Sequence, residues 1–197
     1  WFCERNHKKK KGQKMSENVN PTCPTDCNSL LPSEHYDFCK PTLNFGEIEM
    51  IYLAPGNAQC FSDWLSPVEW LARISDTAVG IDAIRRFAVV GDQPAASNDE
   101  ILISLGRKVY TPKSFTLNLD IDDTDALNYE FFRTLECNEV VKLWYKAGNV
   151  LFGGNCGIDV SINANYTIER GRKTLHKIIF TVTWEDDFSP QRGTSPI

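Results

Sequence analysis

Eleven consecutive residues, 158–168, alternate strictly between apolar and polar side chains. The side chains of a β-strand point alternately to its two faces, so this period of two places one face in a core and the other in water, and it excludes a helix. The polar side chains of this strand are Asp159, Ser161, Asn163, Asn165 and Thr167. These five side chains must therefore meet water or a polar partner.

Two other segments, 115–121 and 178–184, repeat the alternation. Shorter apolar runs bounded by turn residues predict further strands. These runs are 47–53, 87–90, 101–105, 140–145 and 150–152. Glycines at 147–149 and 169–172 predict hairpin turns between strands, and the glycines of 153–157 predict a turn or a bulge.

Two helices are expected between the strands. Ser66 and Glu69 are spaced as a capping box with Pro67 at the first helical position, which predicts a short helix at 67–74. A longer helix is expected at about 124–136.

The longer helix is predicted to be capped by Asp122 or Asp123 and to pack on the sheet. Its expected apolar stripe consists of Leu127, Phe131 and Leu135, with Phe132 beside it. A packed helix among several long strands indicates a mainly β fold, either an antiparallel β-sandwich or a barrel with a helix against it.

The first residues do not resemble a folded segment. Residues 8–11 are four lysines, and Met15 follows shortly after them. We expect Met15 to be the natural start and residues 1–14 to be a translated leader; the alternative is a disordered basic arm. The rest of the chain is expected to divide into a Cys/Pro-rich extended arm (15–44), the β domain (45–188) and a C-terminal tail (189–197).

Composition argues against several classes of function. The net charge is −5 and the pI is about 5.3, whereas nonspecific DNA binding needs a basic face. No apolar run approaches the roughly 18 residues that cross a bilayer, and no secretion signal is recognisable, so we expect neither membrane insertion nor export. The cysteines number seven and are dispersed, which favours reduced, partly buried thiols.

The candidate sites for chemistry are few. The acidic run 120–125 lacks the glycine and the bidentate glutamate of a calcium-binding EF-hand, so it is interpreted as a strand end and a helix cap. The spacing of three cysteines and one histidine resembles that of a tetrahedral zinc site. Unpaired thiols or a disulfide are the favoured interpretation of these residues. The four residues are Cys23, Cys27, His35 and Cys39. No nucleophile–base pair is recognisable, so we expect no enzymatic activity and no cofactor.

The order of elements in the second half resembles the major tail tube proteins of long-tailed bacteriophages and related virion structural proteins. The resemblance covers about residues 85–188 and is carried by the order of elements. These are the strand 115–121, the helix 125–136, the strand 140–145, Phe152-Gly153-Gly154, the alternating strand 158–168 and a last strand ending at Trp184.

This resemblance implies a non-enzymatic subunit that assembles into stacked hexameric rings around a DNA channel. It implies a location in the virion after assembly in the bacterial cytoplasm, and partners that include a tape-measure or terminator protein. The polar face of the strand 158–168 would then line the lumen or a subunit interface. An acidic subunit suits a channel through which DNA must slide.

Two other functions remain open on the sequence. One is a different structural role in the particle, as a capsid decoration or head–tail connector protein. The other is a carbohydrate- or protein-binding β-sandwich, in which exposed Trp and Tyr side chains would form the site.

Overall fold

The computed structural model describes residues 46–74, 80–135, 140–167 and 176–197. All of these belong to one unit, residues 43–197. The expected leader and Cys/Pro-rich arm, the four candidate zinc ligands and the predicted turn 169–172 lie outside the described residues.

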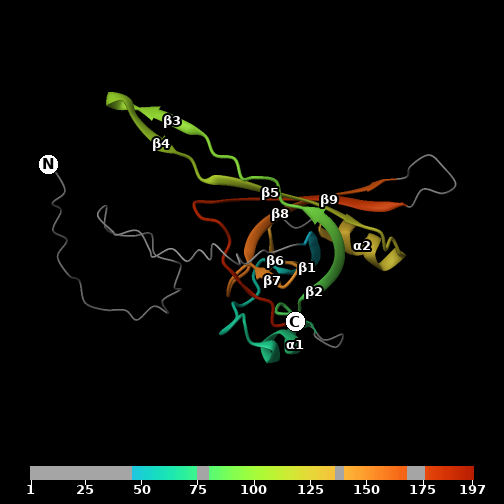
Figure 1. The fold of residues 1–197 in the computed structure, drawn as a ribbon. Helices are drawn as coiled ribbons and strands as arrows, with labels where there is room; N and C mark the ends of the chain where they lie inside the picture. Colours follow the sequence, from blue (N-terminus) through green and yellow to red (C-terminus); the bar gives the residue numbers. More distant parts are fainter. Residues whose placement is uncertain (1–45, 75–79, 136–139, 168–175) are drawn as a thin grey trace, which may run out of the picture. The chain divides into compact units, whose positions relative to one another are not determined.

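Antiparallel strands make up about half of the described chain (Figure 1). They are β1 (Ile48–Pro55), β2 (Arg85–Asp92), β3 (Glu100–Ile103), β4 (Arg107–Tyr110), β5 (Lys113–Ile121), β6 (Val141–Ala147), β7 (Val150–Phe152), β8 (Ile158–Thr167), β9 (Lys177–Asp186) and β10 (Arg192–Thr194). The helices are α1 (Pro67–Ile74), α2 (Ala126–Leu135) and a 3-10 turn, η1 (Ser104–Gly106). The predicted mainly β fold is confirmed, and none of the described helices is long and apolar enough to span a membrane.

The large sheet closes on itself. Its strand order is β1-β2-β5-β9-β8-β6-β7-β10, and β1 also pairs with β6. The strands from β1 round to β6 therefore form a closed antiparallel barrel. β6 pairs along one edge with β1, and along its other edge first with β8 and then with β7. The strands β7 and β10 thus extend the sheet beyond the barrel.

A glycine in β2 allows this strand to lie close to its neighbours, β1 on one side and β5 on the other. Gly91 of β2 pairs with both Ile48 of β1 and Leu119 of β5. A Cβ atom at this position would lie 2.2 Å from the carbonyl oxygen of Asn118. Only glycine permits this close approach of two backbones.

The inner core lies inside the barrel and is built by the alternating strands. In β9 the side chains of Ile178, Phe180, Val182 and Trp184 are buried, as the sequence predicts. In β8 the apolar positions from Ile158 to Ala164 pack against the same core, whereas Tyr166 is exposed. The alternation in the sequence thus places the apolar side chains of these strands on the inward face of the barrel.

The helix α2 covers the inner core through a different face from the predicted one. Phe132 is 2% exposed and packs against Phe180, with ring centroids 5.2 Å apart. Leu135 is also buried, but Leu127 is 79% exposed. The expected stripe was therefore wrong at its first position, because the helix turns Phe132 and Leu135 inward instead.

The cap of α2 also differs from the expectation. The side chain of Asp125 accepts a hydrogen bond from the backbone N–H of Asn128 at 2.7 Å, which makes Asp125 the N-cap. Asp123 accepts a longer bond of 3.4 Å from the N–H of Asp125. The acidic run is a strand end followed by a helix cap, as interpreted, but its capping residue is neither Asp122 nor Asp123.

A second, outer core lies on the outside of the barrel wall. The segment 56–66 and the helix α1 cover the outward side chains of β1, β6 and β7. Its large members are Tyr52, Phe61, Trp64, Trp70, Trp144 and Leu151. Trp70 and Trp144 are fully buried, with ring centroids 5.6 Å apart.

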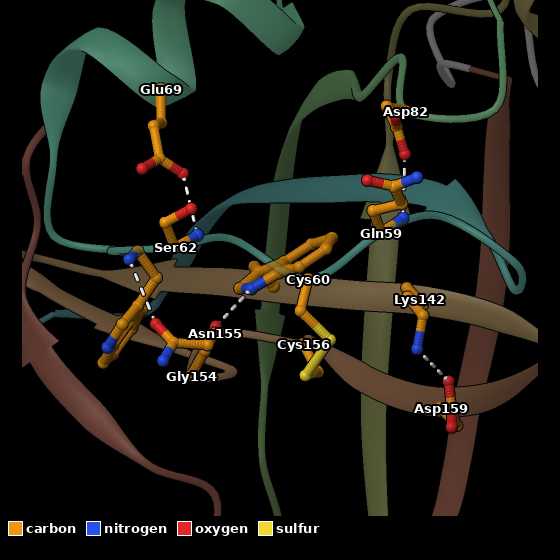
Figure 2. Close-up of a disulfide and its surroundings, with 12 residues drawn as sticks. Gln59, Cys60, Ser62, Glu69, Asp82, Lys142, Gly154, Asn155, Cys156 and Asp159 are labelled. Carbon is orange, nitrogen blue, oxygen red and sulfur yellow. Dashed lines mark hydrogen bonds and ion pairs between the residues drawn. A yellow bond between two sulfur atoms is a disulfide. The ribbon is translucent and has the colours of Figure 1, made fainter. Parts of the chain in front are cut away.

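A disulfide joins the loops around the outer core, as Figure 2 shows. Cys60 and Cys156 are bonded, which corrects the prediction of reduced thiols for these two cysteines. Asn155 lies beside this bond, and its side-chain amide oxygen accepts a hydrogen bond from the backbone N–H of Trp64 at 3.1 Å. Gly153, Gly154 and Gly157 all have positive φ, so the predicted glycine turn is confirmed.

The helix α1 has the predicted bounds, but Glu69 has a different role. Its carboxylate accepts hydrogen bonds from the N–H groups of Ser62 (3.0 Å) and Asp63 (3.3 Å). In a capping box it would accept from Ser66 instead, and the N–H of Ser66 donates to the carbonyl of Asp63. Glu69 therefore holds the preceding loop against the helix.

The segment 189–197 was expected to be a tail, but it carries β10. Its residues Arg192–Thr194 pair with β7, and Ile197 packs against the outer core. The described body thus includes residues beyond 188.

Candidate assembly surfaces

The outer face of β5, β9 and β8 is a polar surface, and we call it the polar wall. β9 is the strand opposite β1 in the closed order, so this wall lies across the barrel from the outer core. Its side chains form three cross-strand rows: Thr116–Thr183–Ser161, Asn118–Thr181–Asn163 and Asp120–Ile179–Asn165. All of these side chains are exposed or half-buried, whereas the opposite wall is covered.

The five side chains singled out in the sequence all lie on β8, outside the barrel. Asp159, Ser161, Asn163 and Asn165 are exposed, and Thr167 is half-buried. The hydroxyl of Thr167 donates to the carbonyl of Lys177 at 3.2 Å. The structure therefore brings the predicted residues together on one face and joins them to β9.

The charges of the polar wall are mainly acidic. Its outward charged residues are Asp120, Asp159, Lys177 and Glu185. The Lys177 ammonium lies 3.3 Å from Asp120, and the Lys142 ammonium of β6 lies 2.9 Å from Asp159. Among the described residues of the wall, hydroxyls and amides with three acids against one base form no cluster of cations that could hold phosphates.

The lateral edges of the polar wall are partly open. β6 pairs with β8 only at Ile158–Val160, so within the described residues 162–167 have a strand partner only on the β9 side. On the other side, β2 pairs with β5 only at Asn118–Asp120, and Ser97 bridges to Ser114. Open strand edges are templates for pairing with another chain.

A hairpin that we call the arm, Glu100–Tyr110, projects from the barrel between β2 and β5 (Figure 1). It consists of β3, η1 and β4, which pair only with each other in the described structure. At its base, Asp99 and Thr111 exchange backbone and side-chain hydrogen bonds of 2.9–3.2 Å. The arm is thus anchored in the body but takes no part in its cores.

The arm is unusually apolar for an exposed element. Its exposed apolar side chains are Ile101, Leu102, Ile103, Leu105, Val109 and Tyr110. Ile101, Ile103 and Val109 share one face with Arg107, and the other face carries an ion pair between Glu100 and Lys108. Contiguous exposed apolar side chains mark interaction sites.

The tip of the arm has two energetically unfavourable features, an exposed apolar side chain and a left-handed backbone conformation. Leu105 is 99% exposed, and its φ of 66° lies in the left-handed region, which non-glycine residues rarely adopt. Gly106 beside it also has positive φ. Strained, exposed positions of this kind concentrate at functional sites.

A groove that we call the α2 groove lies at the other end of β5. It has a volume of about 550 Å³ and is bounded by α2 and the adjoining ends of β1, β2 and β6. Its apolar lining includes Leu53, Leu127, Phe131, Leu135 and Val140, with Glu130 among its polar groups.

The described residues contain no cluster of three or more His, Cys, Asp or Glu side chains that could hold a metal ion. The candidate zinc ligands in the Cys/Pro-rich arm lie outside those residues, so that prediction is untested. His176, just before β9, is exposed, and its Nδ1 lies 3.1 Å from the Tyr166 hydroxyl.

The projecting hairpin Glu100–Tyr110 was not predicted from the sequence. The run 101–105 was predicted as an ordinary strand, yet all the side chains of β3 and β4 are exposed. Two signals could have identified the arm: the run has no alternation, and Pro94 and Pro112 bound the region on either side. An apolar run between such boundaries fits a buried strand and an exposed hairpin equally well.

Comparisons of the chain with protein-family models, with curated proteins and with solved structures find no match.

Proposed function

We propose that this chain is a non-enzymatic structural subunit that assembles with copies of itself into rings, as a tail tube protein of a long-tailed bacteriophage does. Stacked hexameric rings would then enclose a DNA channel in the virion. Assembly would take place in the bacterial cytoplasm, with a tape-measure or terminator protein as partner.

The observation that carries this proposal is the asymmetry of the barrel. One wall is covered by the outer core, and the opposite wall is polar and mainly acidic, with no described element packed over it. A wall of this kind is suited to face a water-filled channel through which DNA slides.

The open edges of the polar wall support ring closure. Residues 162–167 of β8 and the N-terminal half of β5 lie on opposite sides of β9. A neighbouring copy can pair its β5 with this β8, which continues the sheet from subunit to subunit. The contact is heterologous, and such contacts generate rings when the rotation closes.

The alternative functions receive less support. A capsid decoration or head–tail connector protein would use the same assembly surfaces, but it needs no continuous polar wall. A carbohydrate- or protein-binding module would use exposed Trp and Tyr side chains. The described Trp64, Trp70, Trp144 and Trp184 are all buried, which leaves only the exposed Tyr110, Tyr129 and Tyr166 among the described residues.

The first test is direct observation. The purified chain should form rings or tubes in negative-stain micrographs, with a matching mass in light scattering. A chain that stays monomeric at all concentrations overturns the proposal.

The second test asks whether the polar wall lines the channel. Asn163→Lys/Thr183→Lys adds two positive charges at exposed wall positions, where such substitutions cost little stability. The assembled variant should retain DNA, and this binding should fall as salt rises because counterions are released.

Val68→Lys/Ala72→Lys is the matched control, since it adds the same charge at exposed positions of α1. The control should assemble and retain no additional DNA. Equal DNA retention by the two variants would contradict the placement of the wall in the channel.

A further inference from the structure

The bond between Cys60 and Cys156 lies at the surface of the body. Cys60 is exposed and Cys156 is half-buried. They are the two cysteines within the described residues, and both belong to the loops around the outer core, as Figure 2 shows. Small thiols and disulfides in solution can therefore reach this bond.

The two loops are also held together by hydrogen bonds that do not need the disulfide. The backbone N–H of Phe61, next to Cys60, donates to the carbonyl of Asn155 at 2.7 Å. The side-chain oxygen of Asn155, next to Cys156, accepts the N–H of Trp64 at 3.1 Å. The thiols of the reduced chain are thus kept side by side, and the bond can form and break without a rearrangement of the loops.

The loop 153–157 also contacts the C-terminal strand. The N–H of Gly153 donates to the carbonyl of Gln191, just before β10, at 3.0 Å. Within β10, Gly193 packs against Leu65 and Trp64, because a Cβ atom there would lie 2.7 Å from a methyl carbon of Leu65 and 3.2 Å from the indole ring of Trp64. The disulfide therefore joins loops that both hold β10. We call the segment 56–66 together with α1 the cover.

We propose that this disulfide is a redox lock on the cover, open as two thiols while the chain assembles and closed after the particle has left the cell. The inference rests on the proposed function, because assembly in the bacterial cytoplasm takes place where thiols are kept reduced. Outside the cell the surroundings are oxidising, so the same two cysteines become bonded. The bonded structure then corresponds to the subunit of the released particle.

Closure of the lock is an exchange with a small-molecule disulfide such as glutathione disulfide. The exposed Cys60 thiol loses its proton, and its thiolate attacks one sulfur of the oxidant, which releases one glutathione and leaves a mixed disulfide on Cys60. The Cys156 thiolate then attacks the Cys60 sulfur and displaces the second glutathione. The protein loses two protons and two electrons, and the oxidant is reduced to two thiols.

The closed bond should hold the cover in place. Segments of a folded protein open locally, and a covalent link prevents the linked segments from separating. The cover carries Phe61, Trp64 and Trp70 of the outer core, so its opening would expose this core to water. The lock therefore protects the outer core once the chain has left the cell.

The first measurement determines the state of the two cysteines in the cell. The full chain is expressed in the bacterial cytoplasm, and N-ethylmaleimide is added to the intact cells to block free thiols before lysis. Mass spectrometry of the peptides that carry Cys60 and Cys156 reports these two cysteines separately from the others. Both should carry the maleimide, and a bond already present in the cell overturns the lock.

The second measurement closes the lock in the purified, reduced chain. Glutathione disulfide should bond Cys60 to Cys156 and slow hydrogen exchange in peptides from residues 56–74 at least about tenfold, and dithiothreitol should reverse both changes. Cys60→Ser/Cys156→Ser is the matched control, because it keeps the other cysteines, and its exchange should respond to neither reagent. A wild type that forms no bond, or forms it without slower exchange, contradicts the lock.

The outcomes separate this inference from the proposed function. The reduced chain and the double variant should form the same rings as the oxidised chain in micrographs. Rings that form only after oxidation overturn the lock and leave the assembly function standing. A chain that never assembles overturns the assembly function, whereas the thiol state in the cell and the exchange on oxidation are measured without rings and decide the lock.

Discussion

Phe132 connects α2 to the inner core through a chain of aromatic contacts. Its ring lies 5.1 Å from that of Phe87 on β2 and 5.2 Å from that of Phe180 on β9, measured between centroids. The helix bridges two strands of the barrel that do not pair with each other. A single side chain thus fixes the helix over the end of the core.

Phe132→Ala should lower the free energy of unfolding by about 3–5 kcal/mol, because it leaves a cavity in place of a buried ring. Leu127→Ala is the control on the same helix, and at 79% exposure it should change stability by less than about 0.5 kcal/mol. Urea denaturation of both variants checks this. Equal effects would mean that α2 packs through its predicted stripe.

Tyr145 gives the barrel a dependence on alkaline pH. Burial raises the pKa of Tyr145 above its ordinary value, although the hydrogen bond to Gln93, 2.8 Å long, opposes the shift. Burial likewise raises the pKa of Tyr52. In the unfolded chain tyrosines lose their protons near pH 10, whereas in the folded chain the raised pKa means that these two lose theirs only at higher pH.

The folded state therefore binds more protons than the unfolded state above about pH 10, and stability should fall as the pH rises further. Below that pH both states are protonated and the effect vanishes. Tyr145→Phe should show a shallower fall between pH 10 and 11.5 in denaturation experiments. An unchanged slope would show that Tyr145 ionises equally well in the folded barrel.

At the level of elements, α1 and the segment 56–66 depend on the outer core and its links. The guanidinium of Arg73 donates to the carbonyls of Gln59 (2.6 Å) and Cys60 (3.1 Å) and stacks 4.1 Å from the centre of the Phe61 ring. The indole N–H of Trp144 donates to the carbonyl of Gly154 at 2.8 Å. The disulfide joins the same two loops covalently.

Cys60→Ser/Cys156→Ser should lower stability by about 2–4 kcal/mol, because the bond closes a loop between residues 96 positions apart. Tryptophan emission should shift to the red as the cover over Trp70 and Trp144 loosens. Reductant should produce the same change in the wild type and none in the double variant. A wild type insensitive to reductant would indicate that the outer core holds without the bond.

At the scale of the whole molecule, the described body has a closed sheet and two hydrophobic cores. Both cores, as described, are built from residues between Ile48 and Ile197. The sheet is closed within the same residues. We therefore expect this body to fold by itself.

Deletion of residues 1–44 should leave this body folded, with an unchanged β-type circular dichroism spectrum and a cooperative thermal transition. The expected stability change is small, because every core residue in the described part of the chain lies after the deleted segment. An unfolded truncated chain would show that the deleted residues complete a core.

The strands that close the barrel and the short helix could be predicted from the sequence alone. Strand alternation in β8 and β9 follows from the geometry of one extended chain, and Pro67 sets the start of α1 locally. The polar face of β8 was found in the same way. Each of these features depends only on neighbours along the chain.

Tertiary structure alone decided the features that depend on distant residues. Closure of the barrel requires β1 to pair with β6, which lies far along the chain, and no local pattern encodes that pairing. The inward face of α2 depends on where Phe87 and Phe180 lie, and the disulfide depends on the meeting of two loops. The arm is exposed because no described element covers it, and an apolar run by itself does not reveal whether it will be covered.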